Sequence, residues 1–230
     1  VFDAEAMNAR IVAVAAGNKF SLALDADGYV WVWGDNGDGQ LGLGHTDKVA
    51  EPTRMSLHGV TGISAGESHS LFVTKSGAIY AAGDNTDNRM GIGLSETGMH
   101  TAPSYVDVTG AGDNYFVAVS AGGSHSLALT YGALVYGWGD NTSGQAGAGE
   151  NVGVTEPILL DERYNIIKTI VAISAGYDHS MALGEDGDLY TWGSNLQGQT
   201  GLGLLETEDV IWTPTINMAY LHDTDTIIRT

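Results

Sequence analysis

The chain has 230 residues, of which 43% are hydrophobic and 33 are glycines, a composition typical of a folded protein rich in turns. Its 28 acidic residues outnumber 9 basic ones and give a formal net charge of −19, which argues against nucleic acids and anionic membranes as partners because their phosphates would be repelled. The absence of cysteine excludes disulfides and thiolate chemistry, and no apolar run reaches the ~18 residues of a membrane helix.

Four blocks of the sequence align with one another without a gap. They are residues 15–34, 64–83, 120–139 and 174–193, in repeat units that start near residues 11, 60, 116 and 170. The aligned glycines are 49, 56 and 54 residues apart, at Gly17, Gly66, Gly122 and Gly176. A Gly-rich loop such as GQLGLG follows each block, and the chain's 4 prolines lie further downstream, once per unit. A fixed period of this kind indicates a repeat architecture.

Each unit predicts the same order of four β-strands. A β-branched run such as IVAV opens the unit, and a second strand follows an Ala-Gly pair. A link such as DADG or TKSG has the composition of a hairpin turn and leads into a strand that usually ends in Trp-Gly. Each proline then opens a short apolar segment, as suits the first residue of a strand or an edge strand. Because both faces of so small a sheet need neighbours, the fold class predicted is an all-β propeller.

One combined motif recurs with small changes in every unit: AGxxHSxAL, a Trp-Gly pair, GQLGLG and a downstream proline. It resembles the repeat of the regulator of chromosome condensation (RCC1) family, and the resemblance covers residues 1–230 as a single propeller segment. The resemblance implies a ring of seven blades. We therefore expect the four repeats to be part of a seven-bladed ring, or an arc that a homo-oligomer completes, and the chain alone to be unstable as an open monomer.

A histidine followed by a serine recurs in three units, at His69, His125 and His179, and suggests a catalytic pair. Adjacent residues of a strand point to opposite faces, so the two side chains cannot act together as base and nucleophile. The histidines lie on different units, and Phe20 replaces them in the first unit, which argues against a shared zinc site. We expect structural histidines hydrogen-bonded to the backbone of a neighbouring strand, with no metal and no cofactor.

An aromatic stripe recurs in three units, at Trp33, Trp138 and Trp192. A ligand platform and a light-absorbing cluster are alternatives, but packing between blades is favoured because blade faces cover one another. The second unit has Ala82 and Arg89 where the others have Trp and Gln, so we expect its blade to be the most loosely packed. The Gly-rich loops lack the residues of a phosphate loop, and the acidic loops lack the distal glutamate of an EF-hand, which leaves weak divalent cation binding as an alternative.

Segments that differ between units are the candidate partner-binding elements, because the shared residues build the scaffold. The most apolar is residues 204–212, where Leu205, Ile211 and Trp212 stand among acidic residues, a composition typical of an interface anchor with a charged rim. The alternative is that Trp212 caps the adjoining strand. The connecting segment that contains Tyr164 is a further candidate.

The sequence therefore predicts a noncatalytic protein-protein interaction module whose partner it does not identify. The resemblance implies protein recognition, and the family includes a nucleotide exchange factor for a small GTPase and a secreted bacterial inhibitor of β-lactamases. Guanine-nucleotide exchange or another regulatory activity, and inhibition of a bacterial enzyme, are the alternatives. Low lysine content, acidity and the absence of cysteine favour a bacterial cell-surface or secreted setting.

Overall fold

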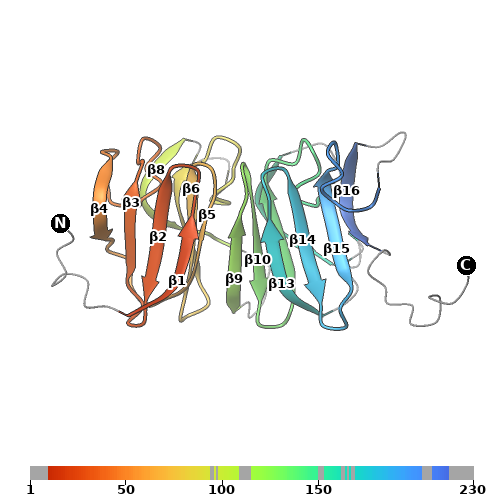
Figure 1. Cartoon of the computed structure of the whole chain (residues 1–230), viewed down its shortest axis with the longest axis horizontal. Coiled ribbons are helices and arrows are strands. Elements are labelled where there is room, and N and C mark those ends of the chain that lie inside the picture. The colour runs from red at the N-terminus through yellow and green to blue at the C-terminus, as the bar shows by residue number, and fades with distance from the viewer. Residues whose placement is uncertain are drawn as a thin grey trace, which may run out of the picture.

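The computed structural model of the chain describes residues 10–93, 96, 98–108, 115–149, 153–161, 164, 166, 169–203 and 209–217. These residues form four sheets of four antiparallel strands, one sheet for each repeat (Figure 1). This arrangement confirms the predicted all-β propeller class. A helix with the length and apolarity of a membrane span is not found within these ranges.

The strands of each sheet are hydrogen-bonded in chain order. The first two sheets contain β1 (Ile11–Ala16), β2 (Phe20–Asp25), β3 (Val30–Gly34) and β4 (Val49–Arg54), then β5 (Val60–Ala65), β6 (His69–Thr74), β7 (Ile79–Asp84) and β8 (Met99–Tyr105). The last two contain β9 (Phe116–Ala121), β10 (His125–Thr130), β11 (Val135–Gly139) and β12 (Val154–Leu160), then β13 (Ile170–Ala175), β14 (His179–Gly184), β15 (Leu189–Ser194) and β16 (Val210–Ile216).

The four sheets stand beside one another as the blades of an open arc. β1 packs against β5, β5 against β9 and β9 against β13, so the first strand of each blade lies nearest the axis. The first and last blades form the two ends of the arc, and both present their outer faces toward the same side (Figure 1). The two middle blades have a neighbour on each face.

The hairpin between the second and third strands decides which side chains share a blade face. Ser126 pairs with Trp138 across β10 and β11, whereas His125 pairs with Gly139. Because neighbouring residues alternate between faces, the serine and the tryptophan share one face and the histidine points to the other. The same register recurs in the other three blades.

The turn of this hairpin takes a residue in the left-handed region. Gly28, Gly77 and Gly187 supply it in three blades, with φ between 78° and 93°. The third blade uses Ala133, with φ 65°, so its Cβ imposes strain of about 1 kcal/mol that glycine would avoid.

Proline lies inside the outermost strand of each blade, which is an edge strand as one of the two predicted alternatives had it, and not at the first residue of the strand. In β12 the ladder shifts register between Val154 and Ile158, and Pro157 lies within this shift. The equivalent residues of the other blades are Pro52, Pro103 and Pro214. Such a bulge on an outermost strand leaves residues unpaired, so the missing N–H of proline costs no ladder bond.

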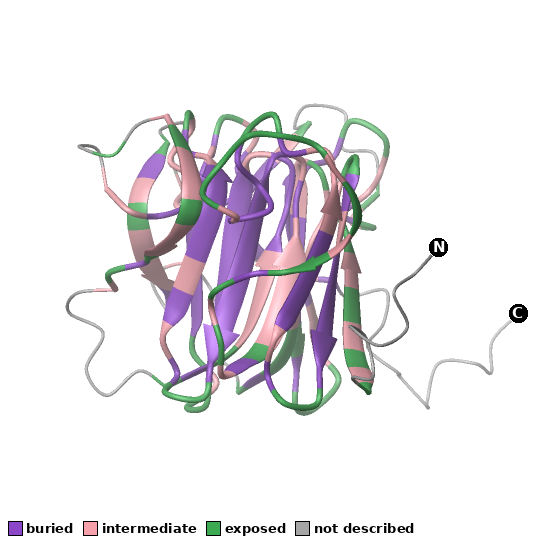
Figure 2. Ribbon diagram, turned by 90° about the vertical axis from the view of Figure 1, so that its left-hand side faces the viewer, coloured by how far each residue is buried: buried purple, intermediate pink, exposed green. Residues whose placement is uncertain are grey.

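The hydrophobic core lies between the blades. Leu71 and Val73 of the second blade pack with Trp138 of the third, and Leu127 of the third packs with Trp192 of the fourth. Figure 2 shows buried residues concentrated along the strands and exposed residues at the loops and the outer edge. The faces of the blades are thus used for packing, and the loops at their ends remain exposed.

Candidate functional site

Each fully buried histidine of the repeat motif bonds to the serine of the next blade. His69 Nε2 lies 2.9 Å from Ser126 Oγ, and His125 Nε2 lies 2.8 Å from Ser180 Oγ. All four residues are buried completely. The sequence predicted a backbone partner for each histidine. The partner is instead a side chain, because the serine of the adjacent blade lies directly opposite the histidine ring.

The serine in turn donates its proton to a loop carbonyl of the preceding blade. Ser126 Oγ donates to the carbonyl of Arg89 at 2.7 Å, and Ser180 Oγ donates to that of Gln145 at 2.8 Å. Because the hydroxyl proton is used there, the histidine donates its Nε2–H to the serine oxygen. The Nδ1 atom of His125 then holds a lone pair, and no described group donates to it.

Burial keeps these histidines neutral. It lowers the pKa of His69 to about 3, with further lowering from the Arg89 guanidinium, and the pKa of His125 to about 4. A histidine that donates to serine cannot accept the serine proton, so the pair lacks the arrangement of a base and a nucleophile. Its role is to join one blade to the next.

The glycine of the motif makes room for the ring. A Cβ on Gly122 would lie 2.3 Å from Cε1 of His125 and 2.6 Å from the backbone oxygen of Gly176. In the first blade a Cβ on Gly17 would lie 2.2 Å from the Phe20 ring. An imidazole or a phenyl ring therefore fills the same space, which explains why phenylalanine can replace the histidine.

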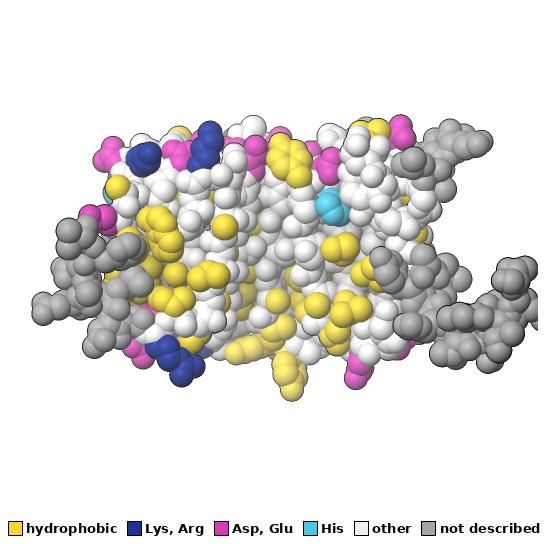
Figure 3. Space-filling view, viewed as in Figure 1, with side chains coloured by type: hydrophobic (Ala, Val, Ile, Leu, Met, Phe, Trp, Pro, Cys, Tyr) yellow, Lys and Arg dark blue, Asp and Glu magenta, His cyan; other side chains and the backbone are white. Residues whose placement is uncertain are grey.

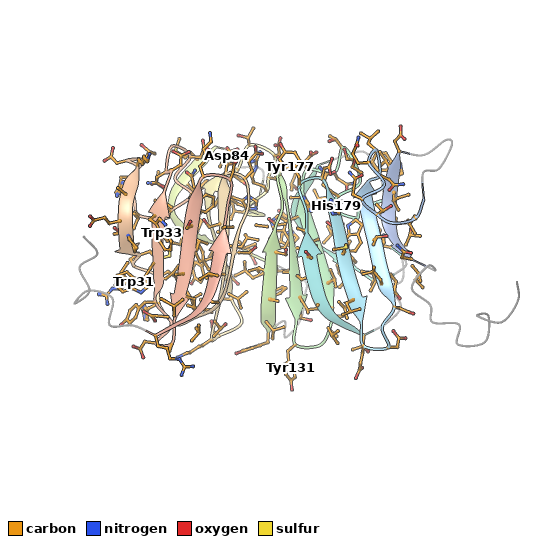
Figure 4. The ribbon with its side chains drawn as sticks, in the orientation of Figure 1. Trp31, Trp33, Asp84, Tyr131, Tyr177 and His179 are labelled. Atoms are coloured by element: carbon orange, nitrogen blue, oxygen red, sulfur yellow. The ribbon has the colours of Figure 1, made fainter. Side chains whose placement is uncertain are left out.

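The tryptophans bond to the same loop carbonyls as the serines. Trp138 Nε1 donates to the carbonyl of Arg89 at 2.9 Å, and Trp192 Nε1 donates to that of Gln145 at 3.0 Å. Each carbonyl accepts one bond from a serine and one from a tryptophan, which satisfies both of its lone pairs. Trp33 faces no other blade among the described residues and lies half-buried on the outer face of the first blade (Figure 4).

A methionine of the first blade fills the place of the tryptophan that the second blade lacks. A Cβ on Gly42 would lie 2.9 Å from the methyl of Met55 and 3.3 Å from the Cβ of Ala82, whereas a Cβ on the equivalent Gly91 would lie 2.7 Å from Nε1 of Trp138. Met55 and Ala82 are both buried, at 2% and 0% exposure. The flexible thioether thus takes the space of the indole, and the expected loose packing is not found at this position.

One asparagine in each Gly-rich loop, missed by the sequence reasoning, closes that loop. The Oδ1 atoms of Asn36, Asn85 and Asn141 each accept the N–H of the residue five positions later, at 2.9 to 3.0 Å. The sequence does contain a pattern that could have predicted this role, since an asparagine follows Asp or Ser at the same position in all four loops. These amide oxygens are therefore committed to backbone. Clusters of three or more potential metal ligands are not found in the described ranges.

A cavity of about 300 Å³ opens where the inner strands end, at the mouth of the channel that the arc encloses. The Ala-Gly turns of all four blades line it, so its walls are small side chains and backbone. Tyr177 stands at this mouth with 68% of its surface exposed, above the ends of the strands (Figure 4). Its hydroxyl donates to Glu67 Oε2 at 3.3 Å, which joins the fourth blade to the second.

The surroundings of the mouth are acidic. The carboxylate of Glu67 raises the pKa of the Tyr177 hydroxyl. Partial burial and the nearby carboxylates of Asp84 and Asp35 raise the pKa of Asp38. Figure 3 shows several Asp and Glu side chains along this edge of the arc, with Lys or Arg side chains among them. We call the cavity with Glu67 and Tyr177 the channel mouth.

Two models of the Regulator of chromosome condensation (RCC1) repeat match the chain, one over residues 27–73, 76–129 and 133–183, and the other over residues 11–40, 60–89, 116–145 and 170–199. The chain belongs to the RCC1 repeat family. The second set of matches gives one RCC1 repeat per blade, and the first three end at the loop residue whose carbonyl bonds to the next blade.

The chain is similar to several longer RCC1-type proteins. It is 34% identical to the ultraviolet-B receptor UVR8 of Arabidopsis thaliana, covering 84% of this chain and 43% of the receptor. It is 43% identical to the human X-linked retinitis pigmentosa GTPase regulator, covering 85% of this chain and 19% of that protein. The crystal structure of Prp20p from Saccharomyces cerevisiae aligns with a TM-score of 0.79 and 26% identity, over 93% of this chain and 52% of that one. The chain therefore spans about half the length of Prp20p and less than half the length of the other two relatives.

Three of the four predicted partner-binding residues are described, and they lie at the border of the third and fourth blades. Ile211 is only 8% exposed and belongs to the core between these blades, so little of its side chain is open to a partner in this structure. Trp212 is half-buried, and its carbonyl accepts the N–H of Gly149 at 3.1 Å. Tyr164 is half-buried against the same core. Leu205 lies outside the described residues.

Proposed function

We propose that the chain is a noncatalytic protein-binding module and that its partner docks over the channel mouth. The observation that carries this proposal is a contrast between two groups of side chains. His69 and His125 are fully buried and bonded across blade junctions, whereas Tyr177 is 68% exposed beside a carboxylate. The residues that could perform chemistry thus hold the scaffold together, and those at the exposed end are available to a partner.

The composition of the channel mouth favours a basic segment of a partner protein. An exposed tyrosine is a frequent anchor of interfaces, and its ring can stack on a guanidinium or ammonium group. Glu67 and the neighbouring carboxylates add attraction for a cation, and the formal net charge of −19 would speed the encounter with a basic surface. Trp212 and Tyr164 are kept as peripheral contacts in this proposal.

Affinity capture with two matched tyrosine variants tests the proposal. Tyr177 and Tyr131 are both strongly exposed, at 68% and 82%, and they lie on opposite edges of the arc, Tyr177 on the upper and Tyr131 on the lower edge in Figure 4. We expect Tyr177→Ala to lose a protein that the wild type and Tyr131→Ala both retain, in capture from extracts of the source cells. Loss with Tyr131→Ala alone, or capture of the same proteins by all three chains, would contradict docking at the mouth.

A second candidate function is regulation of a small GTPase. The Prp20p structure is described together with its binding to Gsp1p and histones, and the 43% identical human relative is named a GTPase regulator. Release of a fluorescent guanine nucleotide from a small GTPase, measured with and without the chain, tests this candidate. An unchanged release rate would count against it.

A further inference from the structure

Several residues at which the repeats depart from their shared pattern meet at the channel mouth. The residue after the Ala-Gly pair differs in every blade, as Asn18, Glu67, Gly123 and Tyr177. The second blade also carries Arg89 where the other three have glutamine. Because the shared residues build the scaffold, these differences mark a part of the surface that is specific to this chain.

The ring of Tyr177 is held in place by the second and third blades. Its hydroxyl donates to Glu67 Oε2 at 3.3 Å, and its backbone oxygen accepts the N–H of Gly123 at 3.0 Å. A Cβ on Gly123 would lie 3.1 Å from Cδ2 and 3.2 Å from Cε2 of the ring, so a larger residue there would crowd the ring. The tyrosine is therefore ordered by its neighbours although 68% of it is exposed, and such preorganisation reduces the entropy lost on binding.

Arg89 joins the two turns that carry this contact. Its Nη1 donates to Ser68 Oγ at 2.6 Å, directly after the glutamate in the chain, and to the carbonyl of Gly123 at 3.4 Å. In the third blade, Gln145 takes the same place and its Nε2 donates to Asp140 within its own blade. The longer side chain of Arg89 thus reaches the next blade and fixes the turn of the second blade against that of the third.

The carboxylate of Glu67 has no cation paired with it. The Arg89 guanidinium pairs with Asp87 at 2.7 Å and with Asp84 at 3.4 Å, and no Lys, Arg or His of the described ranges forms an ion pair with Glu67. Glu67 is half-buried, which strengthens its attraction for an incoming positive charge relative to a fully exposed carboxylate. The mouth therefore combines an ordered aromatic ring with an unpaired negative charge beside it.

We propose that the channel mouth is a receptor for a single arginine side chain of the partner protein, clamped by the Tyr177 ring and the Glu67 carboxylate. The inference rests on the proposed docking at this mouth and names the side chain that enters it. A guanidinium group can stack its plane on an aromatic ring and donate N–H bonds from its edge to a carboxylate. An ammonium group has no plane to stack, so lysine uses only part of the same site.

The cavity also suits the aliphatic part of an arginine side chain. Its wall contains one alanine from the Ala-Gly turn of each blade: Ala16, Ala65, Ala121 and Ala175. Small apolar side chains leave room for the methylene groups of arginine, which gain free energy when they leave water while the charged end stays beside the carboxylate.

Fluorescence anisotropy with three dye-labelled peptides tests the proposal on the full chain. The peptides alternate glycine with arginine, lysine or citrulline, which keeps the shape of arginine without its charge. We expect the arginine peptide to bind about fivefold more tightly than the lysine peptide, and the citrulline peptide not to bind. Equal binding of the arginine and lysine peptides would overturn the arginine clamp and leave the proposed docking of a basic segment standing. Absence of binding by all three would also overturn the clamp, and capture with Tyr177→Ala would then test the docking by itself.

Two substitutions test whether the arginine peptide binds at the mouth. Glu67→Gln removes the charge and Tyr177→Ala removes the ring, so each should weaken binding of the arginine peptide by about fivefold and reduce its advantage over the lysine peptide. The matched controls are Glu185→Gln and Tyr131→Ala, at exposed residues of hairpin turns, and both should bind like the wild type. Equal weakening by Glu67→Gln and Glu185→Gln would mean that net charge alone attracts the peptide, which would overturn the clamp. Near-ultraviolet circular dichroism of each variant verifies that it is folded.

Discussion

Acidification should destabilise the folded chain through the buried histidines of the blade junctions. Their pKa values of about 3 for His69 and about 4 for His125 keep them neutral when folded, whereas unfolding restores the ordinary value of 6.5. The unfolded chain therefore binds more protons between these values, so this contribution to stability is complete above about pH 6.5 and decreases as the pH falls toward 4. From pH 7 to pH 5, each histidine lowers the free energy of unfolding by about 2 kcal/mol.

Urea unfolding at pH 7, 6 and 5 measures this effect, and phenylalanine substitution isolates it. His125→Phe is the suitable variant because Phe20 already occupies the equivalent place in the first blade. We expect the variant to lose about 2 kcal/mol of the pH dependence that the wild type shows between pH 7 and 5. The control is His58→Gln at an exposed position, which should retain the wild-type dependence. If His125→Phe and the wild type respond equally to pH, the reasoning from burial is refuted.

Three further experiments, each by urea unfolding, test the packing and the strain of one turn. Gly122→Ala should cost about 3 kcal/mol because its Cβ would meet an imidazole carbon at 2.3 Å, whereas Gly37→Ala meets only one atom, at 3.8 Å, and should cost less than about 1 kcal/mol; equal costs would contradict the clash. Ala133→Gly should stabilise by about 1 kcal/mol by relieving a φ of 65°, and Gly187→Ala at φ 93° should destabilise by a similar amount; shifts of the same sign would contradict the strain. Met55→Ala should cost about 2 to 5 kcal/mol, and a cost below about 1 kcal/mol would mean that its methyl does not fill the space of the missing indole.

Much of the fold could be predicted from the sequence because the same pattern of residues occurs in four repeats. The period of the glycines, the alternation around each hairpin and the Trp-Gly endings fix the blades and their strand order. The bonds between blades could not be predicted, since alternation along a strand says which face His125 takes but not the height at which Ser180 arrives from the next blade. The role of Met55 could not be predicted for a similar reason, because its side chain fills a space beside Ala82 of the following repeat.

The candidate partner site was harder to predict than the scaffold. Ile211 looked like part of an exposed anchor because its neighbours are acidic, but its register in β16 turns it inward. Tyr177 was not selected, since it lies within the shared block and only the arrangement of four blades places it at an open mouth. The bacterial cell-surface or secreted setting remains a prediction.

The bond from serine to loop carbonyl sets each blade at a fixed level along the axis. Successive repeats differ in length, with block glycines 49, 56 and 54 residues apart, yet the serine bonds of the third and fourth blades measure 2.7 and 2.8 Å. The differences in repeat length therefore leave these two junction bonds nearly equal in length. Loop variation and blade alignment are independent in this design, so a repeat can diversify its exposed end while its neighbours stay in register.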